Sequence, residues 1–274
     1  MFQHNRTKNN NQIVRLWHNY VHENQTLKSL SYHYGISGRS IRKLLDSYNI
    51  RHTEVTIGKG VIVMDTSYFR RDFGVMVFRD HRCGMNIFWK YVDHETLAEY
   101  QSGIDYLLSK GWEIMGIVCD GKRGLFTAFG AIPVQMCQFH QVAIITRYIT
   151  QKPKLQAGKE MKILSYKLKL SSRDEFTTML KQWHEKWKDF LSEKTYTDDH
   201  KKWHYTHKRL RSAYRSIKTN LPYLFTYLEY PEIGMPNTTN SLEGIFSNLK
   251  TKLRIHSGIK AWRKKKIVDD ILSK

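Results

Sequence analysis

Two short apolar runs that each end in an aspartate constrain the fold of this chain most. Residues 61–65 read Val-Ile-Val-Met-Asp, and residues 114–120 read Ile-Met-Gly-Ile-Val-Cys-Asp. Continuous apolar runs of this length are typical of strands that are buried on both faces of a sheet. If these two strands pair in parallel, Asp65 and Asp120 lie side by side at one edge of the sheet.

The segments around these runs predict an α/β domain. Three more segments have the composition of strands: residues 73–78, 86–92 and 134–137. The first three strands have short connections and therefore suggest an antiparallel meander. Two helices are predicted between the strands, one from the N-cap Thr96 to about residue 109 and a short one over residues 124–129. We expect a mixed five-stranded sheet with flanking helices over residues 60–140.

Residues 1–50 have the pattern of a helix-turn-helix module, and residues 51–59 are the predicted linker to the sheet. Apolar residues at helical spacing are followed by a turn at Gly35, a capping Ser37 and a basic helix over residues 37–48. The second helix of such a motif enters the major groove of DNA. The predicted DNA contacts are Arg39, Ser40, Arg42 and Lys43; an ordinary helical hairpin is the alternative.

The charge of the chain favours a polyanionic partner. Lys and Arg number 45 against 25 Asp and Glu, a formal net charge of +20. Nucleic acid is the first expectation and a membrane surface the second, because cations gain free energy by displacing counterions from phosphates. The sequence has no apolar run long enough to span a membrane and no Gly-x-x-x-x-Gly-Lys-Ser/Thr loop. We therefore expect a cytoplasmic protein without a nucleotide cofactor; the resemblance described below places it at the bacterial nucleoid.

Residues 141–236 are predicted to be helical, with no strand. Cations cluster with aromatic residues in residues 200–222 and again in residues 244–268. A solvated helix face is the usual role of such runs, but the first run contains no acid, which favours contact with phosphates. The DNA contacts predicted outside the helix-turn-helix are Lys122, Arg123, Lys208, Arg209, Arg211, Lys250, Lys252 and Arg254.

Glu243 is the candidate for a third acid beside the two aspartates. It lies in the predicted first turn of a helix that Asn240 or Ser241 can cap. Three carboxylates suit Mg²⁺, which prefers oxygen ligands. Each acid also has a structural alternative, since Asp often satisfies a turn and a first-turn Glu often completes a capping box.

These segments resemble the Mutator-like superfamily of bacterial insertion-sequence transposases, which carry an Asp-Asp-Glu triad on a ribonuclease H-like fold. The resemblance lies in residues 63–68, 116–124, 137–140, 237–244 and 253–258. It implies a ribonuclease H-like core that is interrupted by a helical insertion over residues 141–236 and completed by the final catalytic helix and basic tail over residues 237–274. It also implies that Asp65, Asp120 and Glu243 are catalytic and hold two Mg²⁺ ions, which Mn²⁺ can replace, with His140 beside them.

The implied activity is DNA transposition. Such an enzyme binds the terminal inverted repeats of its element, cleaves them to free a 3′-OH and joins that end to target DNA, acting on double-stranded DNA as a homodimer or larger assembly. Cys137 and His140 could also form half of a zinc site, but a buried core cysteine is the favoured interpretation. The remaining alternatives are a ribonuclease H-like nuclease or resolvase, a non-catalytic DNA-binding regulator and a decayed transposase copy.

Overall fold

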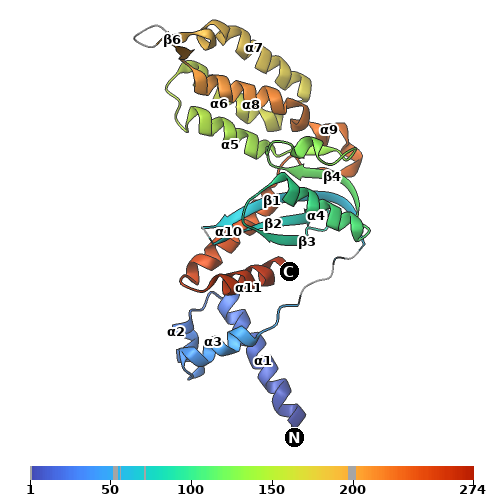
Figure 1. Cartoon of the computed structure of the whole chain (residues 1–274), viewed down its shortest axis with the longest axis vertical. Coiled ribbons are helices and arrows are strands. Elements are labelled where there is room, and N and C mark those ends of the chain that lie inside the picture. The colour runs from blue at the N-terminus through green and yellow to red at the C-terminus, as the bar shows by residue number, and fades with distance from the viewer. Residues whose placement is uncertain (1, 52–54, 56, 71, 197–201) are drawn as a thin grey trace.

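The apolar runs form a five-stranded mixed sheet near the middle of an elongated molecule (Figure 1). The computed structural model describes residues 2–51, 55, 57–70, 72–196 and 202–274. The strands are β1 (Lys59–Phe69), β2 (Phe73–Asp80), β3 (Asn86–Val92), β4 (Glu113–Cys119) and β5 (Val134–Met136). Residues 52–54 and 56 of the predicted linker lie outside the described residues, and β1 begins at the last linker position.

The strand order is β3-β2-β1-β4-β5. Strand β2 runs antiparallel to β1 and β3, whereas β4 runs parallel to β1 and β5. The predicted meander is confirmed, and the first and fourth strands pair in parallel, which is the condition for bringing Asp65 and Asp120 together. This pairing brings the ends of β1 and β4 to the same edge of the sheet.

Helices cover both faces of the sheet because the strands are apolar on both faces. Ile62 and Met64 of β1 pack in one hydrophobic cluster with Tyr100 of α4 (Leu97–Ser109). Val61 and Val63 point to the other face, where they share a cluster with buried residues of α10 (Asn240–Ile255). Alternate residues of one strand thus anchor α4 and α10 on opposite sides.

The N-terminal helices are α1 (Phe2–Val21), α2 (Leu27–Tyr34) and α3 (Gly38–Ser47), and they pack on the C-terminal helix α11 (Ala261–Leu272) (Figure 1). Ser37 caps α3 as predicted, since its side chain accepts a hydrogen bond from the backbone N–H of Ser40 at 3.1 Å. The guanidinium of Arg263 in α11 binds both carboxylate oxygens of Asp46 in α3, at 2.7 and 2.6 Å. The helix-turn-helix is therefore fixed against the end of the chain.

Residues 138–233 form a helical bundle above the sheet (Figure 1). Its helices are α5 (Gln138–Ile149), α6 (Gln156–Lys167), η2 (Leu168–Leu170), α7 (Arg173–Ser192), α8 (Lys208–Leu224), α9 (Thr226–Glu229) and η3 (Pro231–Ile233). They enclose a hydrophobic core of their own that includes Met161, Phe176 and Ile217. Within the described residues, no helix has both the length and the apolar character needed to cross a membrane.

The prediction that residues 141–236 contain no strand is wrong. Strands β6 (Lys194–Tyr196) and β7 (Trp203–Tyr205) pair antiparallel at the end of the bundle. All three residues of β6 are exposed, so the segment lacks the alternation of apolar and polar residues that indicates a strand. The two strands pair through their antiparallel ladder, and the ammonium of Lys194 lies 3.9 Å from the ring centroid of Trp203.

Candidate active site

Asp65 lies in the middle of the site, on β1. Its side chain is buried, with 8% of the residue exposed, and its Oδ1 accepts a hydrogen bond from the backbone N–H of Thr66 at 2.8 Å. Burial raises the pKa of Asp65 to about 7, and the nearby carboxylates of Asp120 and Glu243 add to the increase, although His140 opposes it. The raised pKa therefore reflects first the burial of this carboxyl group and then the negative charge of its neighbours.

Asp120 directly follows β4 at the same level of the sheet. Val63 pairs with Val118 in the parallel ladder, so each aspartate stands two residues beyond this pair on its own strand. The Oδ1 of Asp120 accepts a hydrogen bond from the backbone N–H of Lys122 at 3.1 Å. The carboxylate of Asp120 is thus held by the turn that follows its strand.

Glu243 lies in the first turn of α10. The N-cap of this helix is Thr239, one residue before the predicted candidates Asn240 and Ser241, and its side chain makes no capping bond. Its hydroxyl instead donates to the Sγ of Cys137 at 3.4 Å, and its backbone N–H donates to the same atom at 3.3 Å. These contacts tie the start of the Glu243 helix to the end of β5.

A second pair of hydrogen bonds strengthens this connection. The backbone N–H of Gln138 donates to the carbonyl oxygen of Asn237 at 2.9 Å, and the Nδ2 of Asn237 donates to the Oε1 of Gln138 at 3.1 Å. The two segments that bear His140 and Glu243 are therefore locked together. Cys137 is fully buried, as the favoured interpretation of it as a core cysteine requires.

His140 stands next to Glu243, with its Nε2 3.5 Å from the Glu243 Oε1. Burial works against protonation of the ring, but the Cys137 side chain and the carboxylates of Asp65 and Asp120 outweigh it and raise the pKa of His140 to about 9. These neighbours favour the protonated form of the imidazole, whose positive charge offsets part of the charge of the carboxylates.

The structure brings Asp65, His140 and Glu243 into one group. Each offers a ligand atom, and these atoms all lie within 4.8 Å of one another. Asp120 is close enough to affect the pKa of Asp65 but does not belong to this group. Of the three predicted metal ligands, two therefore converge with His140, and the third stands on the adjacent strand.

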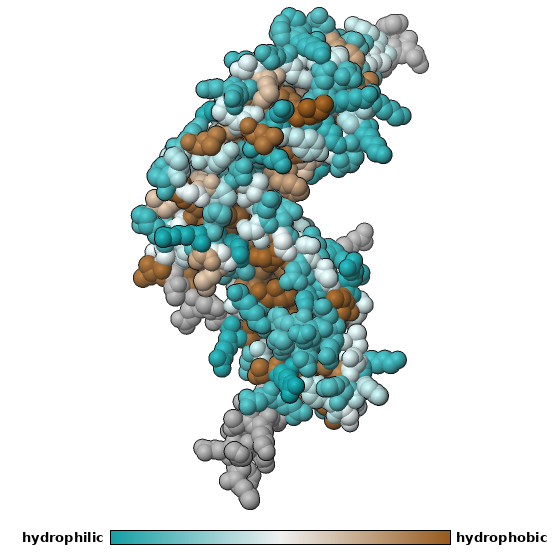
Figure 2. Space-filling view, turned by 180° about the vertical axis from the view of Figure 1, so that it is seen from behind, coloured by the Kyte–Doolittle hydropathy of each residue, from teal (hydrophilic) through white to brown (hydrophobic). Residues whose placement is uncertain are grey.

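The group opens into a cleft of about 500 Å³. Glu243, Ser247, Lys250 and Arg254 line one wall, at the spacing of a single face of α10, while Leu242, Phe246, Leu249 and Leu253 form the buried face of the same helix. Figure 2 shows the molecular surface hollowed between the helical bundle and the part below it. The cleft thus carries carboxylates at one end and two cations along its wall.

Some of the other predicted DNA contacts are exposed side chains, and others form hydrogen bonds within the protein. Arg39, Ser40, Arg42 and Lys43 are exposed on α3, as are Arg123 and Lys208 elsewhere, and Lys122 is half-buried. Three cations donate to backbone carbonyl oxygens instead: Arg209 to Arg147, Arg211 to Leu191 and Lys252 to His22, each at 2.7 Å. These three stabilise the packing of helices, so their charge is less available to a ligand.

The cleft also contains four hydroxyl side chains for which the sequence predicts no role: Thr66, Ser67, Ser247 and Thr251. The hydroxyl of Ser67 is buried without a hydrogen-bonding partner among the described residues. Periodicity is the signal that could have found them, because Ser67 follows Asp65 by two residues in a strand and Ser247 follows Glu243 by four in a helix.

The raised pKa of Asp65 predicts how the stability of the metal-free protein depends on pH. The ordinary value is 3.8 and the folded value is about 7, so between these values the folded protein holds a proton that the unfolded chain releases. The free energy of unfolding contributed by this group therefore falls as pH rises through that window. Asp65→Asn is expected to gain stability relative to the unchanged chain from about pH 4 to pH 7, measured as urea midpoints in EDTA. A stability difference that does not vary with pH would contradict this.

Comparison with known proteins gives little further guidance. No protein-family model and no curated protein matches this chain. One solved structure with similarity is described as the cryo-EM structure of the simian T-cell lymphotropic virus intasome in complex with PP2A regulatory subunit B56 gamma, at 13% identity and a TM-score of 0.24. The similarity covers 73% of this chain and 66% of that chain. A TM-score of this size does not establish a shared fold, so the site is interpreted from its own geometry.

Proposed function

We propose that this chain is a DDE transposase of an insertion sequence, which binds terminal inverted repeats and joins the cleaved ends to target DNA. The observation that carries this proposal is the convergence of Asp65, His140 and Glu243 in a cleft lined by Lys250 and Arg254. Carboxylates beside cations suit the cleavage of a phosphodiester. Metal ions held by the carboxylates would neutralise charge at the reacting phosphate, and the cations would bind the adjacent phosphates of the DNA backbone. The strand order of the sheet supports the ribonuclease H-like fold that this proposal includes.

The residues of the cleft fit a divalent metal ion. Asp65, His140 and Glu243 place ligand atoms within 4.8 Å of one another, and the unpartnered hydroxyl of Ser67 offers a further polar atom in the same cleft. Asp65 and Glu243 would hold Mg²⁺ or Mn²⁺. Asp120 is a further carboxylate near enough to Asp65 to affect its pKa. When bound, such ions activate the attacking oxygen and neutralise charge on the phosphate.

The other residues of the cleft bind and orient. Lys250 and Arg254 lie four residues apart on one face of α10 and hold the DNA backbone on the side away from the acids. The protonated Nε2 of His140 faces the Oε1 of Glu243 and orients that carboxylate. The hydrogen bonds from Thr239 to Cys137 fix the position of the Glu243 helix relative to the segment that bears His140.

The exposed basic side chains of α3 carry the recognition of DNA ends in this proposal. Arg39, Arg42 and Lys43 face solvent, and Ser37 fixes the start of their helix. Helix-turn-helix proteins read base edges with this part of the second helix. Because two element ends must be processed together, the active form on DNA is a homodimer or larger assembly.

A joining assay separates this proposal from its alternatives. The purified chain is mixed with labelled fragments from the ends of the element, supercoiled plasmid and Mg²⁺, and the products are resolved on denaturing and native gels. A transposase yields plasmid joined to the labelled 3′ end. Hydrolysis without joining would indicate a ribonuclease H-like nuclease or resolvase, and end binding without cleavage in Mg²⁺ or Mn²⁺ would indicate a regulator or a decayed copy.

The cations of the cleft wall give a prediction for DNA affinity. Lys250→Ala combined with Arg254→Ala is expected to weaken binding of duplex DNA and to reduce the slope of log affinity against log salt concentration by about 2, because each phosphate contact contributes about 0.9. Fluorescence anisotropy over a salt series measures both quantities. Lys252→Ala is the matched control on the same helix, and its slope should stay unchanged because its ammonium donates to His22. Equal slopes in all three proteins would remove these contacts from the account.

A further inference from the structure

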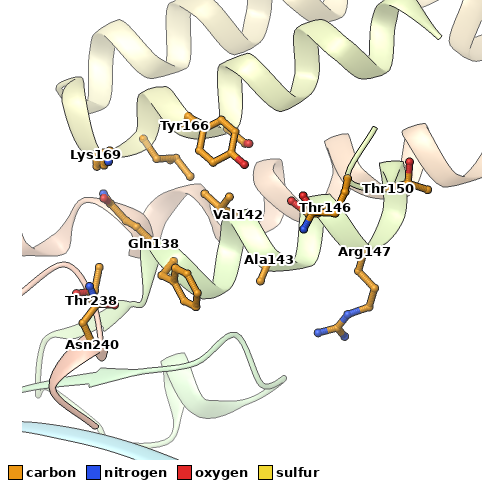
Figure 3. A pocket seen from close by; sticks show the side chains of 14 residues that line it. Gln138, Val142, Ala143, Thr146, Arg147, Thr150, Tyr166, Lys169, Thr238 and Asn240 are labelled. Carbon is orange, nitrogen blue, oxygen red and sulfur yellow. The ribbon is translucent and has the colours of Figure 1, made fainter. Parts of the chain in front are cut away.

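A second cavity, of about 770 Å³, lies beside the cleft. Figure 3 shows that it is bounded by α5, by the end of α6 with η2, which contribute Tyr166 and Lys169, and by the segment leading into α10, which contributes Thr238 and Asn240. The cleft and the cavity share two segments, since Phe139 adjoins His140 on α5 and Asn240 lies one turn before Glu243. The cavity and the cleft are therefore neighbours along the first turns of α5 and α10.

The cavity combines aromatic and cationic side chains. The rings of Phe139 and Tyr166 line it and are 49% and 48% exposed, although large apolar side chains gain free energy by burial. Arg147 and Lys169 are the charged residues among the 14 that line it, and none of the 14 is an acid. The lining along α5 reaches from Gln138 to Thr150, about 18 Å at 1.5 Å per residue.

We propose that this cavity binds unpaired nucleotides of the DNA strand that extends from the cleft. Phe139 and Tyr166 stack on the bases, which every base allows because each has a π-face, and Arg147 and Lys169 hold the phosphates between them. Asn240 presents amide groups that can donate to and accept from a base edge. The inference rests on the proposed function, because it takes the cleft as the place where the DNA strand is cut.

The charged residues of the lining favour this occupant over a protein segment. The walls include apolar side chains such as Val142 and Leu168, but they also carry a cation on each of two elements, Arg147 on α5 and Lys169 on η2, and no acid. Stacking platforms flanked by cations are typical of sites for single-stranded nucleic acid. The cavity is therefore assigned to the unpaired part of a DNA substrate rather than to a partner protein.

The test compares two labelled duplexes of the same sequence, one blunt and one with a short unpaired oligothymidine tail. Binding is measured by fluorescence anisotropy in EDTA, so that cleavage does not interfere. The unchanged chain should bind the tailed duplex more tightly than the blunt one. Phe139→Ala combined with Tyr166→Ala should lower affinity for the tailed duplex by about fivefold or more, the scale of stacking one base, and leave affinity for the blunt duplex unchanged.

Two control variants outside the cavity, and circular dichroism as a test of folding, accompany this comparison. Tyr148→Ala removes an aromatic residue of α5 that is 36% exposed and does not line the cavity, and Lys167→Ala is the corresponding control for Lys169→Ala. Both controls should keep the preference for the tail, while Lys169→Ala should reduce it without touching an aromatic ring. Circular dichroism establishes that each variant is folded, and Lys169→Ala decides the matter if the aromatic pair does not fold.

The outcomes separate this inference from the proposed function. Equal affinities for the two duplexes, or an equal loss in Tyr148→Ala, would overturn the cavity as a nucleotide site even if the chain cleaves DNA in Mg²⁺. Loss of the tail preference in the cavity variants would support the site even if no cleavage occurs, and the transposase proposal would then fail alone.

Discussion

Glu243→Gln is expected to reduce metal-dependent cleavage and joining of DNA by about 100- to 1,000-fold, the scale of removing one group that stabilises charge at the reacting centre. Gln has nearly the same shape but lacks the negative charge, so the helix and the cleft keep their form while a metal ligand is weakened. Single-turnover cleavage of a labelled end fragment in Mg²⁺ measures the effect.

Binding of the same fragment in EDTA should change little in Glu243→Gln, because Lys250 and Arg254 remain in place. Glu232→Gln is the matched control, since Glu232 is exposed in η3 and does not line the cleft. If Glu243→Gln lost binding in step with cleavage, or cleaved as fast as Glu232→Gln, Glu243 would not be an acid of the active site.

Trp17→Ala is expected to lower the free energy of unfolding by about 3–5 kcal/mol, as for other large aromatic residues removed from a core. Trp17 is 4% exposed and stacks on Tyr48 with ring centroids 4.9 Å apart. The ammonium of Lys266 in α11 lies 5.0 Å from its ring centroid, and the ring belongs to the same hydrophobic cluster as Val268. The substitution therefore removes contacts that join the helix-turn-helix to the C-terminal helices.

Urea unfolding followed by circular dichroism measures this loss. Tyr32→Ala is the control on α2, where the side chain is 92% exposed and little change is expected. A loss below about 1 kcal/mol for Trp17→Ala would mean that the N-terminal helices are not held by this cluster.

The sheet was predictable because its strands carry a strong local signal. The apolar runs that end at Asp65 and Asp120 have the length and composition of buried strands, and the short connections indicate the meander. The hairpin of β6 and β7 carries no such signal, since β6 has no buried residue. Local pattern thus finds strands that bury apolar side chains and misses strands that do not.

The site was predictable in its composition and less so in its geometry. The sequence places Asp65 at a strand and Glu243 at a helix start, but the distance between them depends on the contact of Thr239 with Cys137, which joins segments far apart along the chain. The position of the Asp120 carboxylate depends on a turn hydrogen bond from Lys122. Such contacts follow from tertiary packing and leave no periodic signal.

The cations show the same limit. Residues 200–222 are basic without acids, which predicts a phosphate-binding surface, yet Arg209 and Arg211 donate to carbonyl oxygens and the guanidinium of Arg211 stacks at 3.5 Å on Tyr205. Lys250 and Arg254 reach the cleft because they share the helix face of Glu243. Helical phase relative to Glu243 is therefore a better guide to which cations line the cleft than the local density of charge.

In the proposed function, Asp65 and Glu243 form one divalent-metal site in the cleft. Titration with Mn²⁺, followed by the electron paramagnetic resonance signal of the free ion, tests this site without relying on activity. The unchanged chain and Glu232→Gln should take up Mn²⁺ alike, while Asp65→Asn and Glu243→Gln should each bind it at least about tenfold more weakly. Equal uptake by all four proteins would show that Asp65 and Glu243 do not bind the ion.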